Sequence, residues 1–382
     1  MSTMERILRL MADKKASDVY LSALSPALIK INGQTLPINS QILPPDAPLN
    51  LLAEVLPPER IEALKELGEL NMAVPMEGVG NFRISGFRQR GSYAAVIRFI
   101  SNDIPSLDSL NLPPILANLM MEKRGLVLMV GATGAGKSTT LASMIDLRNA
   151  TTPGHILTIE DPIEYLFTNK KSVVNQREVG SDTQSLQMAL KNALRQAPDV
   201  IMIGEISDRE TMSAAIAYAQ SGHLCLATMH ANNSYQALNR ILSFYPVEVR
   251  STLLGDLSAA LKAIVSQRLL RTVAGSRAPA VEVMLNTKLI AELIEKGDFS
   301  GVKEAMENSM AEGSQIFELD IARLISEKIV TRKEGLLHAD SPTNLMWRLE
   351  NDFNAAAKAA AKPEEDPDDE PSFTEITLNV KH

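Results

Sequence analysis

The sequence predicts an α/β protein: a parallel sheet with helices between its strands, preceded by a small α+β domain and followed by a helical part. Continuous apolar runs separated by helical stretches indicate the parallel sheet, because strands covered on both faces have no polar side. Shorter strands and turn residues fill residues 1–100, and helical apolar periodicity dominates after Leu253. The apolar runs are GLVLMVG (125–131), HILTIED (155–161), DVIMIGE (199–205) and HLCLATMH (223–230).

Length and composition limit the class of protein. A chain of 382 residues should hold two or three domains at roughly 100–200 residues each. Its 45% hydrophobic and 22% charged residues exclude disorder of the whole chain. The single cysteine, Cys225, excludes an intrachain disulfide and a paired-cysteine zinc site, and it favours a reducing compartment.

Charge and hydropathy indicate where the protein works. No apolar run approaches the ~18–20 residues that a membrane span needs. The N-terminus alternates charged and apolar residues and lacks the core of a signal peptide. We therefore expect a cytoplasmic protein with no direct membrane insertion, which reaches a membrane only through partners. A net charge of −8 argues against a chain that wraps nucleic acid by bulk charge.

The first elements of the α+β domain (1–100) are a helix and a hairpin. Apolar residues 7, 8, 10 and 11 share one face of an initial helix. Residues 17–22 and 27–38 read as short strands. Asn32 and Gly33 predict a hairpin turn, because both tolerate the positive φ of a type I′ turn.

The rest of this domain is a helix and two further strands. Pro57 and Pro58 should open a helix that runs through Leu67 and ends at Gly68. Residues 81–101 should form two strands that turn around residues 90–91.

Composition divides the remainder of the chain. Residues 101–115 are rich in Pro, Ser and Asn and are the predicted linker. Residues 116–350 form the second domain, which we expect to be helical from 253 to 348 apart from APAVEVML (278–285). Residues 351–382 are predicted to be a disordered acidic tail, because 363–375 carry three prolines and seven acidic side chains.

A glycine-rich loop predicts a phosphate site. GATGAGKS (131–138) fits G-x-x-x-x-G-K-[ST], follows a buried strand and opens a helix. Backbone N–H groups would surround the phosphates, Lys137 would reach the β and γ phosphates, and Ser138 would bind Mg²⁺. A chance match in a glycine-rich turn is the alternative. The nucleotide-binding candidates are Gly131, Ala132, Thr133, Gly134, Ala135, Gly136, Lys137, Ser138 and Thr139.

Carboxylates beyond this loop suggest hydrolysis. DVIMIGE should be the second phosphate-site strand; Gly204 occupies the slot of the usual Asp, and Asp199 lies at the wrong end, so Glu205 is left to hold Mg²⁺ through water. Glu164, on a turn after Pro162, is free to polarise a water. A strand-end charge for Glu205 and a solvated acidic turn for Glu164 are the alternatives. The acidic side chains around this turn are Glu160, Asp161, Glu164 and Glu178.

Together these motifs carry a family resemblance over roughly residues 1–350. The P-loop, ILTIEDPIEY (156–165), VIMIGEISD (200–208) and SGHLCLATMH (221–230) resemble the secretion and pilus ATPases, and within them the PilT/PilU retraction branch. The chain lacks the cysteines of the zinc insert common in assembly ATPases. The PilT-type Ala-Ile-Arg-Asn signature is replaced by residues Leu289, Ile290, Ala291 and Glu292, which favours the PilU paralogues.

The resemblance implies a RecA-like ATPase domain behind a PAS-like N-terminal domain, in a ring hexamer that binds ATP and Mg²⁺ between protomers. By motif, Glu164 matches the catalytic carboxylate and Glu205 the strand-end Glu. His230 matches the later His of its motif, and His223 reads better as a backbone cap. Arg83 and Arg98 match arginines that approach a neighbour's nucleotide in trans; a surface ion pair is their alternative.

The predicted function is an ATPase motor that couples hydrolysis to type IV pilus retraction in twitching motility. The implied partners are copies of the chain, a second retraction ATPase and the inner-membrane pilus platform protein, at which the cytoplasmic ring would be peripheral. Two alternatives stay open: an accessory ring subunit that supports a partner motor, and a pilus-assembly or type II secretion ATPase. A small-molecule kinase lacks its Arg-rich lid here, and a transporter ATPase lacks an LSGGQ-like signature.

Overall fold

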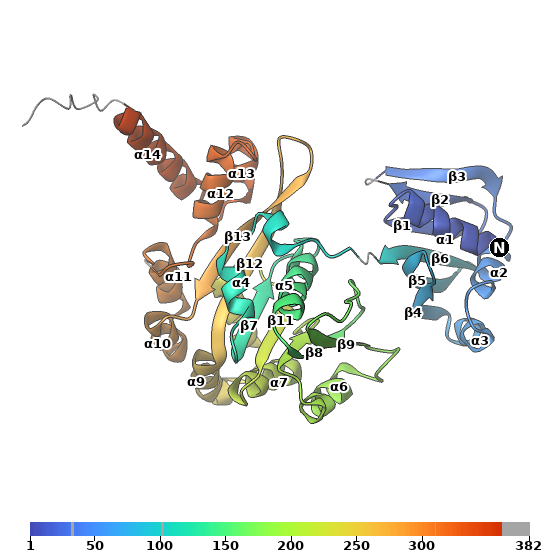
Figure 1. The fold of residues 1–382 in the computed structure, drawn as a ribbon, viewed down its shortest axis with the longest axis horizontal. Coiled ribbons are helices and arrows are strands. Elements are labelled where there is room, and N and C mark those ends of the chain that lie inside the picture. Colours follow the sequence, from blue (N-terminus) through green and yellow to red (C-terminus); the bar gives the residue numbers. More distant parts are fainter. Residues whose placement is uncertain (32–33, 101–102, 310, 361–382) are drawn as a thin grey trace, which may run out of the picture.

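The computed structural model describes residues 1–31, 34–100, 103–309 and 311–360, and for 352–360 only the backbone (Figure 1). Two sheets organise the chain, one in the N-terminal part and one in the larger part that follows. Within the described ranges, no helix has the length and apolarity needed to cross a bilayer.

The N-terminal part is a six-stranded antiparallel sheet with helices on one face. Its strand order is β3-β2-β1-β6-β5-β4. Met4, Leu8 and Met11 of the first helix are buried against sheet residues such as Phe82 and Ile84, as expected for an amphipathic helix. The elements are α1 (Thr3–Asp13), β1 (Asp18–Ser22), β2 (Pro26–Ile31), β3 (Gln34–Ile42), α2 (Ala47–Ala53), α3 (Pro58–Leu67), β4 (Glu69–Met76), β5 (Gly80–Gln89) and β6 (Ser92–Ile100).

Turn residues in the sequence correctly predicted where several of these elements end. α3 ends at Gly68 with φ +81°, and β5 and β6 turn through Arg90 and Gly91, both with positive φ. β2 and β3 pair antiparallel with Ile31 opposite Gln34, while the predicted turn residues Asn32 and Gly33 lie outside the described residues. α2 and β4 were not predicted.

The larger sheet has seven strands in the order β13-β12-β7-β11-β10-β8-β9. All neighbours pair in parallel except β12 and β13. Its elements up to β13 are η1 (Leu107–Leu110), α4 (Ile115–Met120), β7 (Gly125–Val130), α5 (Lys137–Thr151), β8 (Gly154–Glu160), β9 (Ser172–Glu178), α6 (Leu186–Ala193), η2 (Leu194–Gln196), β10 (Val200–Ile203), α7 (Arg209–Gln220), β11 (Leu224–Met229), α8 (Ser234–Ser243), η3 (Val247–Val249), α9 (Arg250–Ala260), β12 (Leu261–Arg271) and β13 (Arg277–Leu285).

Two cores, one on each face, explain the continuous apolar runs. Leu126, Leu128 and Val130 of β7 pack with α7 and α9, whereas Val127 and Met129 pack with α4 and α5 on the other face. Every residue of β7 is therefore buried, and so is every residue of β11. The predicted α/β class with a parallel sheet is confirmed.

The prediction that residues 253–348 are helical apart from 278–285 is wrong for 261–271. This segment is β12, which lies between β7 and β13 in the middle of the sheet. A strand buried on both faces has no period of two, so its apolar run cannot be told from a buried helix by pattern alone. The error matters because β12 brings Gln267 to the glycine-rich loop.

Helices dominate after β13, as predicted. They are α10 (Lys288–Lys296), α11 (Phe299–Glu307), α12 (Phe317–Ser326), α13 (Arg332–His338) and α14 (Pro342–Ala360). The backbone of α14 continues to Ala360, past residue 351, where the tail was predicted to begin. The segment that follows Asn354 is rich in alanine, the best helix former. The acidic stretch 363–375 lies outside the described residues.

Candidate functional site

The glycine-rich loop joins the end of β7 to the start of α5, as the sequence predicts. Gly136 caps α5 in a left-handed conformation with φ +87°. A Cβ at this position would come within 2.7 Å of the Gln267 side-chain nitrogen, so both backbone and space require glycine. The first N–H groups of α5 are thereby left at the mouth of the loop, where a phosphate could accept from them.

Lys137 is held inside this loop. Its Nζ donates to the carbonyl oxygens of Gly131 at 2.8 Å and Ala132 at 3.0 Å. Burial lowers its pKa, and the negative charges of Glu205 and Glu164 oppose that effect. The buried Lys137 ammonium group can attract a polyanion. A metal ion that the polyanion brings with it would offset the negative charge of the two carboxylates.

The Gln267 side chain, on β12, forms hydrogen bonds that hold the glycine-rich loop in place. This role was not predicted from the sequence. Its side-chain nitrogen donates to the Ala135 carbonyl at 2.9 Å, and its side-chain oxygen accepts from the Thr140 hydroxyl at 2.8 Å. Gln267 is buried, so both bonds lie away from solvent. Because β12 was predicted to be helical, no sequence signal placed this residue beside the loop.

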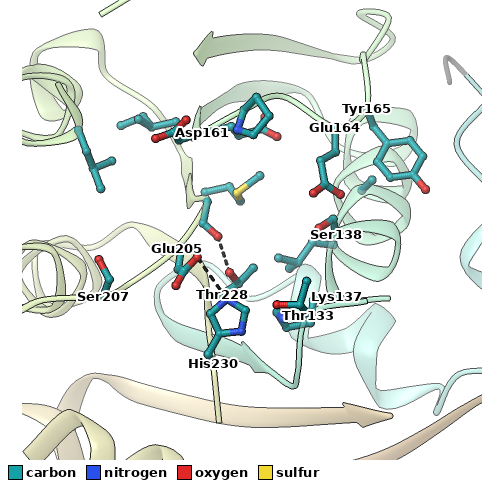
Figure 2. Close-up of a pocket in the computed structure, with 18 of the residues that line it drawn as sticks. Thr133, Lys137, Ser138, Asp161, Glu164, Tyr165, Glu205, Ser207, Thr228 and His230 are labelled. Atoms are coloured by element: carbon teal, nitrogen blue, oxygen red, sulfur yellow. Dashed lines mark hydrogen bonds and ion pairs between the residues drawn. The ribbon is translucent and has the colours of Figure 1, made fainter. Parts of the chain in front are cut away.

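A cavity of about 430 Å³ opens over the loop, at the carboxyl ends of β7, β8, β10 and β11 (Figure 2). Ligand sites in parallel sheets lie at this edge. Of the predicted site residues, the cavity brings together Thr133, Gly134, Lys137, Ser138, Glu164, Glu205 and His230. Figure 2 places Glu164 and Ser138 on one side and Glu205 with His230 on the other.

Glu205 and His230 form one wall of this cavity. The His230 Nε2 atom lies 3.4 Å from a Glu205 oxygen, with the two side chains 35% and 46% exposed. They come from the ends of neighbouring strands, β10 and β11, whose carboxyl ends meet because the strands are parallel. A Cβ at Gly204 would come within 3.2 Å of the Glu160 backbone, which explains why an Asp in that slot would need the turn to move.

The opposite wall is the acidic turn that follows β8. Glu164 is exposed to the cavity, and the Tyr165 hydroxyl is 2.8 Å from that of Thr139 on α5. Glu178 has a different role, because its oxygens accept from the Ile163 N–H at 3.1 Å and the Ser181 hydroxyl at 3.1 Å. Glu178 therefore shapes the turn rather than facing a ligand.

Glu160 is buried beneath the same turn. Burial raises the pKa of its carboxyl to about 7, against hydrogen bonds from the Thr158 hydroxyl (2.6 Å) and the Gln176 amide (3.2 Å). A carboxyl that titrates near neutrality is typical of functional sites and also of buried networks. Its side chain lines the cavity beside Asp161.

The side chains present fit Mg²⁺. This ion prefers oxygen ligands and is usually bound by one or two carboxylates together with substrate phosphates and waters. The Ser138 hydroxyl, on the same side of the cavity as Lys137, and the Glu205 carboxylate on the other side supply such oxygens. Across the described ranges, no cluster of three or more His, Cys, Asp or Glu side chains is arranged to hold a metal.

Arg83 and Arg98 lie outside this cavity, in an adjoining one of about 210 Å³ that they share with residues 162–165. They face each other across β5 and β6. Arg98 pairs with the buried Asp18 at 3.0 Å while its own side chain stays 62% exposed. Both arginines thus lie beside the acidic turn of their own chain, and the trans role that the resemblance implies stays a prediction.

Two other residues considered from the sequence lie away from the cavity. His223 precedes β11, at the strand end opposite His230, and its Nδ1 is 3.0 Å from the Ser221 hydroxyl. Asp199 precedes β10 and accepts from the His155 N–H at 2.8 Å. Asp199 thus lies at the strand end away from the phosphate loop, as expected, whereas the His223 ring bonds a side-chain hydroxyl and a backbone cap was expected.

A parallel sheet that carries a P-loop at its carboxyl edge, faced by two carboxylates, defines the class: a RecA-like P-loop nucleoside triphosphatase. The model of the family described as type II/IV secretion system protein matches residues 64–350. The type IV pilus ATPase PilU of Pseudomonas aeruginosa is 46% identical over 342 residues, which are 89% of this chain and 90% of that protein. The pilus retraction ATPase PilT of the same organism is 33% identical over 88% of this chain and 98% of its own length.

A solved structure agrees with these relatives. The crystal structure of the pilus retraction motor PilT with bound ADP matches with a TM-score of 0.84 and 36% identity, covering 91% of this chain and 99% of that one. The chain therefore belongs to the type II/IV secretion system protein family, within its PilT/PilU branch of ATPases. The predicted family and the RecA-like fold are confirmed.

Proposed function

We propose that the chain is a type IV pilus retraction ATPase that works as a hexamer. The observation that carries the proposal is the meeting of Lys137 and Ser138 with Glu164 and Glu205 around one cavity, in a chain with 46% identity to PilU. The first pair holds phosphates, and the second pair provides carboxylates for water and metal. Retraction is the activity named for the relative PilT, and a further relative is named a twitching motility protein.

Each side chain has a distinct role in hydrolysis. Lys137 and the loop N–H groups bind the β and γ phosphates, and Ser138 and Glu205 hold Mg²⁺, which offsets phosphate charge when bound. Glu164 orients the attacking water and accepts its proton. His230 stays beside Glu205 through their 3.4 Å contact and senses the γ phosphate. Arg83 and Arg98 would approach the nucleotide of a neighbouring subunit from the N-terminal sheet.

One feature favours the accessory-subunit alternative. The departure from the PilT-type signature falls on α10, where Leu289 is 56% exposed and Glu292 is also exposed. Replacing Arg by Ala291 next to these positions alters a surface rather than the core. A changed surface with an intact cavity suits a subunit that hydrolyses ATP but relies on a second retraction ATPase for force.

We further propose the partners and place of action that follow. The ring contacts copies of the same chain, a partner retraction ATPase and the platform protein of the pilus at the inner membrane. It works in the cytoplasm, peripheral to that membrane.

Glu164→Gln tests the hydrolytic role. The amide keeps the size of the side chain but cannot accept a proton, so turnover should fall on the order of 10²–10⁴-fold while ATP affinity stays within twofold. Steady-state hydrolysis and equilibrium binding of ATP measure the two quantities. Turnover at the unmodified rate would make Glu164 a solvated surface carboxylate.

Pilus dynamics in cells test the motor role. Cells that lack this chain, or carry it with Lys137→Ala, should lose retraction force or frequency, measured by imaging labelled pili. Hydrolysis by the purified chain with and without the partner ATPase separates an autonomous motor from an accessory one. Normal retraction in both strains would overturn the proposal.

A further inference from the structure

Side chains of neighbouring residues form hydrogen bonds with several peptide groups of the turn that carries Glu164. The Glu178 carboxylate accepts from the Ile163 N–H, directly before Glu164, at 3.1 Å. Gln176 binds the side after it: its amide nitrogen donates to the Tyr165 carbonyl at 2.8 Å, and its amide oxygen accepts from the Phe167 N–H at 2.9 Å. Glu164 is exposed, so its own side chain does little to fix the turn.

Gln176 also reaches the buried carboxyl beneath the turn. The same amide nitrogen lies 3.2 Å from a Glu160 oxygen. One side chain therefore connects the end of β8 with two peptide groups of the turn. Its own backbone is fixed by β9, where Gln176 pairs with Thr158 of β8.

We propose that Gln176 is a positioning residue for hydrolysis: its three hydrogen bonds set the height and direction of Glu164 over the P-loop. This inference rests on the proposed role of Glu164 as the group that orients water. Gln176 does not line the cavity, so it acts through the turn rather than on the nucleotide. A misplacement of about 1 Å in such a group can cost on the order of 10²-fold in rate.

The geometry distinguishes this role from that of the loop supports. The hydrogen bonds of Gln176 end on the acidic turn, whereas those of Gln267 end on the phosphate loop and α5. Loss of Gln176 should therefore change the catalytic step and leave nucleotide binding intact. A residue that merely stabilises the fold would weaken both.

The test is Gln176→Met, which keeps the length of the side chain and removes every hydrogen bond. We expect kcat for ATP to fall at least tenfold, with the dissociation constant of a fluorescent ATP analogue within twofold. Asn175→Ala is the matched control: it removes an amide from the same strand that contacts His155 at 2.9 Å, and it should leave kcat unchanged. Gln176→Glu, which keeps the acceptor for the Phe167 N–H but loses the donors, should show the same selective loss of kcat.

A double-mutant cycle with Glu164→Gln decides the mechanism. If Gln176 acts through Glu164, Gln176→Met should cause no further loss when Glu164 is already Gln, measured by single-turnover hydrolysis of radiolabelled ATP. An equal loss in both backgrounds, or an unchanged kcat in Gln176→Met and Gln176→Glu, overturns the inference. An inactive Glu164→Gln beside a fully active Gln176→Met leaves the proposed function standing and removes this inference alone.

Discussion

Lys137 supplies a positive charge to the phosphate loop, and its side chain is buried there. Two loop carbonyls hold its ammonium group at 2.8 and 3.0 Å, and burial lowers its pKa. A ligand that displaces these two carbonyls must offer the ammonium group stronger hydrogen-bond acceptors, and phosphate oxygens do so.

Lys137→Ala should weaken ATP binding and abolish turnover. Loss of one partner of a desolvated charge pair costs about 2–5 kcal/mol of binding free energy. Equilibrium binding of ATP and steady-state hydrolysis measure the effects. Lys262→Ala is the matched control, because this lysine pairs with Glu122 at 3.2 Å near the start of β12 and should not affect either quantity. Near-normal turnover in Lys137→Ala would contradict the assignment of the cavity.

Glu160 gives the molecule a pH-dependent stability. Its pKa of about 7 in the folded chain exceeds the ordinary value of 4.5, so the folded state binds the proton more tightly than the unfolded state. The stability that this carboxyl contributes is fully present below about pH 4.5 and is lost as pH rises through 7, by at most about 3 kcal/mol.

Glu160→Gln imitates the protonated carboxyl. Its free energy of unfolding should therefore increase relative to that of the unmodified chain as pH rises from 5 to 8. Denaturant unfolding at several pH values measures this difference. A difference in unfolding free energy that is constant over that range would show that Glu160 does not titrate there.

The residues proposed to contact ligand could be found from sequence motifs, whereas those proposed to hold them in place could not. Lys137, Ser138, Glu164 and Glu205 stand in motifs whose spacing states their chemistry. Gln176 acts through hydrogen bonds to peptide groups, and nothing in the sequence marks which amide will meet which carbonyl.

At the scale of elements, β12 shows where pattern reading stops. Its residues are buried on both faces between two other strands, so the segment looked helical by apolar content alone. By contrast, the end of α3 at Gly68 was predicted because a left-handed glycine has a local conformational reason that needs no tertiary contact.

β12 also supplies a testable contribution to the loop through Gln267. Gln267→Leu should lower both ATP affinity and the free energy of unfolding, the latter by about 2 kcal/mol or more, because Ala135 and Thr140 lose buried partners. Isothermal titration and denaturant unfolding measure the two effects. Gln315→Leu, which removes a bond to the Val281 carbonyl at 2.8 Å away from the loop, should lower stability without affecting ATP affinity. Unchanged ATP affinity in Gln267→Leu would mean that the loop holds its shape without β12.

At the scale of the whole molecule, the N-terminal sheet meets the ATPase part at the acidic turn. Arg83 and Arg98 share a cavity with Glu164 and Tyr165 of their own chain. The resemblance implies that these arginines reach a neighbour's nucleotide in trans, and within one chain they lie beside its own acidic turn. Which subunit the arginines serve depends on how the two domains are placed around residues 101–115. No local sequence pattern predicts that placement.

Mixed rings test whether the arginine serves its own chain or, as the resemblance implies, a neighbour. Arg98→Ala should reduce hydrolysis on the order of 10³-fold, since an arginine stabilises charge on the transferred phosphoryl group. Each subunit in a mixture of Arg98→Ala and Lys137→Ala chains has either a defective arginine or a defective lysine. If the arginine serves its own chain, no site in the mixture is complete and hydrolysis should not recover. If it serves a neighbour, some interfaces pair an intact lysine with an intact arginine, and hydrolysis should return.

Mixtures of each variant with unmodified chains are the control for coupling around the ring. They measure how far one inactive subunit silences active neighbours, and that factor sets the recovery to be expected from a trans arrangement. Hydrolysis that rises to this level in the double mixture would confirm the trans arrangement expected from the sequence. Hydrolysis that stays at the level of the single variants, while mixtures with unmodified chains remain active, would mean that each nucleotide site takes its arginine from its own chain.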